Sequence, residues 1–244
     1  MKNKFFLIAS SVLSLFFLTT CGLDTYYTLS PPPAYLWYPS ISITDKAQKY
    51  FDFYSATNTN TDGSFRFLGT AVYYRIYASQ QTMNSHISSI SSVNTSSDYS
   101  AAAIRMIGYG YQQLYTADGS IQPLISVEGA RVRIRLTNNL ESVSTGIGNS
   151  AQITIINKIP RRALGVNKTF DFGRYEDSRY AAQKDNYAPP VQGDEDFESG
   201  TVSDKKYYVN MYAVAVGRDT TYTTYYSNVL HLGSIVIDAG TVDN

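Results

Sequence analysis

Hydrophobic and polar residues alternate with a period of two along several segments of the chain. Long runs of this kind, rich in aromatic and β-branched residues, occupy 65–77, 207–216 and 225–237. In the first run Val72, Tyr74 and Ile76 share one face, because successive side chains of a strand point to opposite sides. Shorter runs lie at 41–43 and 50–54. The pattern predicts strands towards both ends of the chain and a mainly β fold.

A further pair of strands is predicted in the middle of the chain. Residues 131–136 alternate strictly, which places Arg131, Arg133 and Arg135 on one face of a strand and three aliphatic side chains on the other. Residues 151–155 have the same period. We expect these two strands to form a long β-hairpin.

Two segments have the periodicity of helices instead. Apolar residues recur every three or four positions in 80–93 and in 97–107, although both segments are rich in serine. We expect two short helices there, the second of which would have Tyr99, Ala103, Ile104 and Ile107 on its apolar face.

The N-terminal segment differs in kind from the rest of the chain. Lys2 and Lys4 precede an apolar run, 5–18, that is shorter than the roughly 20 residues needed to span a bilayer core. Positive charge, an apolar stretch and a following cysteine are typical of an export signal. The ending Leu18-Thr19-Thr20-Cys21 resembles the lipobox of bacterial lipoproteins, in the relaxed form found in spirochaetes. The resemblance implies that residues 1–20 are a signal peptide and that Cys21 is acylated and anchors the protein in membrane lipid.

Cys21 is the only cysteine of the chain, so no disulfide can form within one molecule. It is followed by Pro31-Pro32-Pro33, which favours an extended polyproline conformation without internal hydrogen bonds. We therefore interpret 21–33 as the lipidated N-terminus with a stiff spacer.

The two outer parts of the chain resemble a fibronectin type III domain. Tyr207, Val209, Met211 and Ala213 fit that family's Tyr-x-hydrophobic-x-hydrophobic-x-Ala strand. The resemblance implies a fibronectin type III or immunoglobulin-like β-sandwich in which Tyr207 is the structural tyrosine corner.

This sandwich would consist of residues 34–77 and 205–238. The 78–204 segment between them is then a large insertion, which contains the two short helices, the extra β-hairpin and a polar loop.

Charge and composition narrow the range of partners. Lys and Arg number 20, as do Asp and Glu, so nothing suggests nucleic acid as a partner. The chain contains 22 tyrosines, which offer large contact area at small entropic cost and are typical of recognition surfaces. The same composition is also common in exported β proteins, so both interpretations stay open.

Catalytic and metal-binding chemistry has few candidates in the sequence. His86 and His231 are the only histidines, and neither lies in a recognisable catalytic motif. The chain has no Gly-x-Ser-x-Gly motif and no phosphate-binding glycine loop. The acidic run Asp194-Glu195-Asp196 lacks the spacing of a calcium loop, and we interpret it as part of a solvated surface loop. We expect no enzymatic activity, no cofactor and no metal site.

The arginine ladder formed by Arg131, Arg133 and Arg135 has two interpretations. Guanidinium groups bind phosphate and carboxylate bidentately, so the ladder could hold an anionic polymer, lipid headgroups or an acidic glycan. Equally, it could be the plain polar face of an amphipathic strand.

The sequence as a whole predicts a lipid-anchored cell-envelope protein, in the outer membrane, that acts as a non-catalytic binding or adhesion module for a protein or glycan. Two alternatives stay open at this point. One is a periplasm-facing structural subunit of an envelope complex, and the other is an envelope hydrolase.

Overall fold

The computed structural model describes the chain in several stretches. The described residues are 27–34, 39–43, 48–60, 63–95, 97–116, 123–136, 153–155, 160–163, 170, 172, 190–198 and 206–238. Over these residues the protein is mainly β with two helices, so the predicted fold class is confirmed at this level. Within the described part, no helix is long and apolar enough to cross a membrane.

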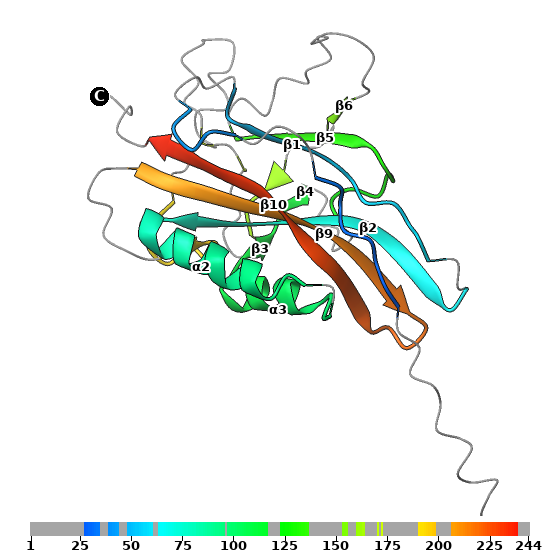
Figure 1. Ribbon diagram of the computed structural model, residues 1–244. Coiled ribbons are helices and arrows are strands. Elements are labelled where there is room, and N and C mark those ends of the chain that lie inside the picture. The colour runs from blue at the N-terminus through cyan, green and yellow to red at the C-terminus, as the bar shows by residue number, and fades with distance from the viewer. Residues whose placement is uncertain are drawn as a thin grey trace, which may run out of the picture.

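The larger sheet is built on three long strands. β2 (Phe65–Tyr77) lies between β9 (Lys206–Asp219) and the short β3 (Gln112–Gln113), and β10 (Thr224–Asp238) pairs with the other side of β9. β8 (Phe197–Glu198) adds a short parallel pairing at the end of β2. Figure 1 shows β2, β9 and β10 crossing the molecule as its central layer. The prediction of three long strands is therefore confirmed.

The smaller sheet has the order β1-β5-β6. β1 (Tyr50–Tyr54) pairs antiparallel with β5 (Arg131–Arg135), whereas β6 (Ile153–Ile155) pairs with β5 in parallel. The predicted hairpin between 131–136 and 151–155 is therefore wrong. Parallel strands need a crossover connection of a dozen or more residues, and the stretch between these two strands is long enough to provide it.

Strands from the predicted insertion pair with strands outside it. β5 pairs with β1, while β3 and β8 both pair with β2. Also within the insertion, β4 (Tyr115–Thr116) and β7 (Pro160–Arg161) form a separate two-stranded sheet. The segment between β2 and β9 thus supplies strands to both main sheets.

Two helices cover the face of the larger sheet that is turned away from the smaller one (Figure 1). α2 (Gln80–Ser92) begins at Ser79, whose hydroxyl accepts a hydrogen bond from the backbone N–H of Thr82 and so caps the first turn. α3 (Ala101–Gly108) follows after a short connection. Both predicted helices are confirmed, although the second begins four residues later than expected.

The buried face of α3 differs from the prediction. Ala102, Ala103 and Met106 are buried, whereas Ile104 is 62% exposed and Ile107 is 39% exposed. Consecutive residues of a helix are about 100° apart, so a helix that buries residues 102, 103 and 106 turns 104 and 107 away from the sheet. The small alanine side chains let the helix approach the sheet closely.

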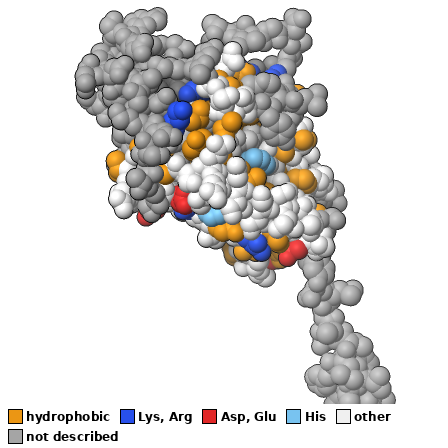
Figure 2. Space-filling model, turned by 60° about the vertical axis from the view of Figure 1, so that its left-hand side comes forward, with side chains coloured by type: hydrophobic (Ala, Val, Ile, Leu, Met, Phe, Trp, Pro, Cys, Tyr) orange, Lys and Arg blue, Asp and Glu red, His pale blue; other side chains and the backbone are white. Residues whose placement is uncertain are grey.

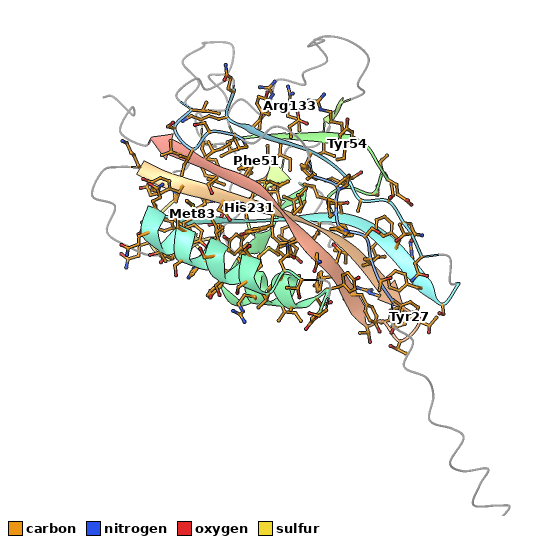
Figure 3. All side chains as sticks on the ribbon, in the orientation of Figure 1. Tyr27, Phe51, Tyr54, Met83, Arg133 and His231 are labelled. Carbon is orange, nitrogen blue, oxygen red and sulfur yellow. The ribbon has the colours of Figure 1, made fainter. Side chains whose placement is uncertain are left out.

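The larger sheet is hydrophobic on both faces because it is the middle of three layers. Between the two sheets, Phe51 and Phe53 of β1 pack against apolar side chains of β2, β9 and β10. On the other face, Met83 and Ile90 of α2 and Met106 of α3 pack against alternate residues of the same strands. Figure 3 shows Phe51 and Met83 on opposite sides of this sheet. Truncating one of the buried phenylalanines to alanine should cost about 3–5 kcal/mol.

Candidate functional site

The predicted arginine ladder lies on the outer face of the smaller sheet, where Figure 3 shows Arg133 pointing away from the core. Asp52 of β1 lies opposite Arg133 in the strand register. Arg131 donates to the Asp52 carboxylate from Nε and Nη2 at 2.8 and 3.0 Å, and Arg133 donates to it from Nη2 and Nε at 2.7 and 3.2 Å. Asp52 is only 5% exposed. Two of the three arginines therefore share one buried carboxylate.

An aromatic ring completes this face. The guanidinium carbon of Arg133 lies 4.0 Å from the centre of the Tyr50 ring, and that of Arg135 lies 5.7 Å from it. Such cation–π contacts fix the direction of the guanidinium planes. With three arginines to one aspartate, the described side chains of this face carry net positive charge. Asp52 occupies two donors each of Arg131 and Arg133. The binding of an external anion by Arg131, Arg133 and Arg135 stays a prediction.

Asp52 was not singled out in the sequence, although a signal for it exists. It occupies an alternate position of the apolar strand Tyr50–Tyr54, where an acidic side chain must face away from the core. The three arginines of the partner strand supply the complementary charge. Finding the pairing requires knowing that β1 and β5 are neighbours.

The roles of the other two predicted site residues, Cys21 and Tyr207, both stay predictions. Cys21 lies outside the described residues, so its acylation stays a prediction. Tyr207 begins the core-facing part of β9, is partly buried, and contacts the ring of Phe197 edge-on with 5.7 Å between ring centres. The 199–205 segment, towards which a tyrosine-corner hydroxyl would donate, also lies outside the described residues, and the role of Tyr207 stays a prediction.

A buried ion network was missed by the sequence analysis. Arg162, 1% exposed, donates from Nε and Nη2 to the two carboxylate oxygens of Asp196 at 2.7 and 2.6 Å. Its Nη2 also donates to Asp194 at 2.9 Å. The Tyr74 hydroxyl donates to Oδ2 of Asp196, which also accepts from Arg162 Nε, at 2.5 Å, and it accepts from the backbone N–H of Ala163 at 2.9 Å.

This network corrects the interpretation of the acidic run as a solvated loop. Asp196 is fully buried, because a guanidinium and a phenol together satisfy its oxygens. Burial, followed by the charge of Asp196, raises the pKa of Tyr74 well above its ordinary value, so its hydroxyl remains a donor. Asp194 also contributes to the ion network, through its bond to Arg162. The arrangement ties the loop at 190–198 to the C-terminal part of β2.

A second cluster, which we call the tyrosine row, lies beneath the helices on the outer face of the larger sheet. Its members are Tyr77, Tyr111 and Tyr212, with His86 at one end and His231 at the other. Neighbouring rings are in contact throughout, with centres 5.6, 6.1, 5.4 and 4.7 Å apart along the row from His86 to His231. Histidine side chains reach the surface at two places on the face shown in Figure 2.

Hydrogen bonds join the row to the sheet. The Tyr111 hydroxyl donates to Oδ1 of Asn210 at 2.6 Å, and Nδ2 of Asn210 lies 2.6 Å from Nε2 of His231. An amide nitrogen can only donate, so Nε2 accepts and the ring of His231 is neutral. At the other end the Tyr77 hydroxyl lies 3.0 Å from Nδ1 of His86.

Burial sets the ionisation of the whole row. It raises the pKa of Tyr77, Tyr111 and Tyr212 well above the ordinary value for tyrosine. Burial also lowers the pKa of His231 to about 4 and, to a smaller degree, lowers the pKa of His86. None of these five side chains therefore changes charge between pH 7 and 10. The row can therefore hold the helices on the sheet through uncharged aromatic contacts and hydrogen bonds.

The described surface carries few large apolar side chains. The exposed ones are Ile104, Ile107, Val127, Val191 and Tyr222. Only Ile104 and Ile107 are close neighbours, one helical turn apart on α3. On the face shown in Figure 2, hydrophobic atoms form scattered groups among polar ones, and charged side chains are sparse.

Among the described residues, no group of three or more His, Cys, Asp or Glu side chains is placed to hold a metal ion. No protein-family model, curated protein or solved structure matches the chain.

Proposed function

We propose that the protein is a lipoprotein of the cell envelope, anchored in the outer membrane through acylated Cys21, and that it acts as a non-catalytic binding or adhesion module. The exposed pair Ile104 and Ile107 carries the binding role. A large aliphatic side chain gains about 1.5–3 kcal/mol when it is buried. Two such side chains on one helix turn, beside the exposed Arg105, offer a protein or glycan partner an apolar contact with a charged rim.

The proposal includes a fibronectin type III or immunoglobulin-like sandwich. The strands of that fold are lettered from A to G along the chain. The last two strands, F and G, share one sheet with C and C′, and strands B and E lie in the other sheet. The strand orders β10-β9-β2-β3 and β1-β5 match this arrangement when β1, β2, β5, β9 and β10 are taken as B, C, E, F and G. Tyr207 then lies near the start of strand F, as a tyrosine corner should. The helices and the parallel pairings of β6 and β8 are additions from the insertion.

Acylation is tested on the full-length precursor, expressed in a bacterium that processes lipoproteins. We expect mature protein in the membrane fraction, with a lipid-modified N-terminal peptide in mass spectrometry, and loss of both in Cys21→Ala. Protease treatment of intact cells then determines the side of the membrane, because cleavage indicates a surface module and protection indicates a periplasmic one. An unmodified Cys21 in membrane-fractionated protein would refute the anchor.

The binding surface is tested with a photo-crosslinking amino acid at position 104 in intact cells. Val127, 56% exposed on a different part of the molecule, is the matched control position. We expect a discrete cross-linked product from position 104 that is absent at 127 and that is lost when Ile107 is changed to Ser. A cross-linked product with a fixed ratio of the protein to one partner would favour the alternative function, a structural subunit of an envelope complex. Identical patterns from both positions would refute the surface.

A further inference from the structure

Three exposed side chains lie together at one end of the larger sheet: Arg66 of β2, Arg218 of β9 and Tyr222 of the turn between β9 and β10. We call them the turn surface. Tyr222 is 79% exposed. Arg66 and Arg218 are both exposed and lie directly opposite each other in the register of β2 and β9. The Arg218 guanidinium carbon lies 6.0 Å from the centre of the Tyr222 ring. The three side chains therefore form one cationic and aromatic surface.

This surface is unfavourable for the isolated protein. Like charges directly opposite each other destabilise a strand pair, and in the described part of the chain neither guanidinium forms an ion pair. Asp219, which follows Arg218 in the chain, is occupied within the turn by the backbone N–H groups of Thr221 and Thr223 and by the Tyr225 hydroxyl. An external anion is the missing complement.

The backbone of the turn is also unfavourable. Tyr222 has φ +66°, in the left-handed region that bulky L-residues rarely adopt. Glycine or asparagine would relieve the strain, so the chain keeps a large aromatic ring exposed at an unfavourable position. Such an outlier suggests a role for the ring outside the fold.

The start of the described chain is fixed at this same end of the sheet, as Figure 3 shows for Tyr27. The ring of Tyr27 stacks on Phe65 with 4.7 Å between centres and contacts Tyr225 edge-on at 5.4 Å. Its hydroxyl lies 2.5 Å from Oγ of Ser64. The six residues from Cys21 to Tyr27 reach at most about 20 Å. β2 then runs about 40 Å away from this end before α2 begins.

We propose that the turn surface rests on the anionic phospholipid headgroups of the membrane that holds Cys21. The inference depends on the proposed function for its tether, and it adds an orientation. Tyrosine favours the boundary between headgroups and water, and arginine binds phosphate bidentately. The turn surface faces the bilayer, and the start of α2 is held away from it.

The test uses the acylated protein, reconstituted in vesicles of phosphatidylcholine with phosphatidylglycerol. Acylation leaves no free thiol, so a cysteine placed at the exposed Thr220 can be labelled with a fluorophore by itself. The matched label is at Gln81, exposed at the start of α2. We expect nitroxide-headgroup lipids to quench the probe at 220 several-fold more strongly than the probe at 81. Equal quenching, or stronger quenching at 81, would overturn the orientation.

The chemistry of the contact is tested by Arg66→Gln combined with Arg218→Gln. Each basic residue near an anionic surface contributes roughly fivefold, so the equilibrium constant for contact between the turn surface and the bilayer should fall about twenty-five-fold in the double variant. Arg105→Gln, which changes an exposed arginine on α3, should leave it unchanged. Quenching that is independent of phosphatidylglycerol and of both arginines would overturn the anionic contact.

The two proposals fail in different ways. If the wild-type protein floats with the vesicles but the probe at 220 is unquenched, the tether stands and the orientation is wrong. If the wild-type protein does not float with the vesicles, the tether is wrong and the orientation falls with it.

Discussion

Replacing Arg162 with methionine should destabilise the protein more than any surface substitution. Both side chains of the Arg162–Asp196 pair are completely buried, and two short hydrogen bonds join them. Methionine fills much of the same volume but cannot donate. Asp196 would keep the Tyr74 hydroxyl as a donor and lose its only described cationic partner.

The size of the effect follows from the asymmetry of buried ion pairs. Removing one partner leaves an uncompensated charge and costs about 3–5 kcal/mol, whereas replacing both by apolar residues is often neutral. Domains of this kind are stable by about 5–15 kcal/mol, so Arg162→Met alone should remove a large fraction of the stability. The double variant Arg162→Met with Asp196→Leu should recover part of the loss, because the unpaired charge is gone although the Tyr74 hydroxyl loses its acceptor.

Urea denaturation of the four proteins in this cycle measures the coupling directly. Arg105→Met, at an exposed position on α3, is the matched control and should change the free energy of unfolding by less than about 0.5 kcal/mol. If Arg162→Met were as mild as that control, the buried network would not exist as described. If the double variant were no more stable than Arg162→Met, the loss would come from packing and not from the unpaired carboxylate.

Three further predictions concern histidine, charge and backbone. Because burial lowers the pKa of His231 to about 4, the unfolded chain binds a proton below pH 6.5 that the folded chain does not. The free energy of unfolding should therefore fall by up to about 3 kcal/mol between pH 6.5 and 4, and denaturation of His231→Gln should lack this fall. Asp52→Asn should cost about 3 kcal/mol and lower the melting temperature by roughly 6–12 °C, since two arginines share its charge. Gly69→Ala should cost at least about 2 kcal/mol in urea, because its φ is +132° and an added Cβ would lie 2.3 Å from the carbonyl oxygen of Ile125, whereas Gly63→Ala should be neutral.

Elements whose periodicity is local could be predicted from the sequence. The long strands β2, β9 and β10 and the helices α2 and α3 each contain enough residues for the period to be visible. The neighbours of each element could not be predicted in the same way. Strict alternation in 131–136 correctly indicated a strand, but the direction of β6 against β5 depends on a crossover that no local pattern specifies.

The same limit applies to the candidate site. The arginine ladder was visible as a pattern, whereas its partner Asp52 lies about 80 residues earlier and becomes a neighbour only when β1 pairs with β5. Similarly, Asp196 looked like one member of a solvated acidic run, because the burial of its carboxylate depends on Arg162 and on Tyr74. Charge in a sequence predicts solvation until a partner of opposite charge is brought to it.

The tyrosines show where the composition was ambiguous and how the structure separates the two interpretations. Tyr73, Tyr74, Tyr77, Tyr111 and Tyr212 are buried, and their hydroxyls and rings link the sheets and the helix layer. Much of the tyrosine content of the described chain therefore stabilises the fold, and a high count alone does not indicate a recognition surface. The exceptional tyrosine is Tyr222, which is exposed on an unfavourable backbone beside a cationic pair. In the described part of the chain, the exposed isoleucines on α3 are positions where substitutions should alter binding and leave stability unchanged, whereas replacing Tyr222 by glycine or asparagine should also relieve its backbone strain and raise stability.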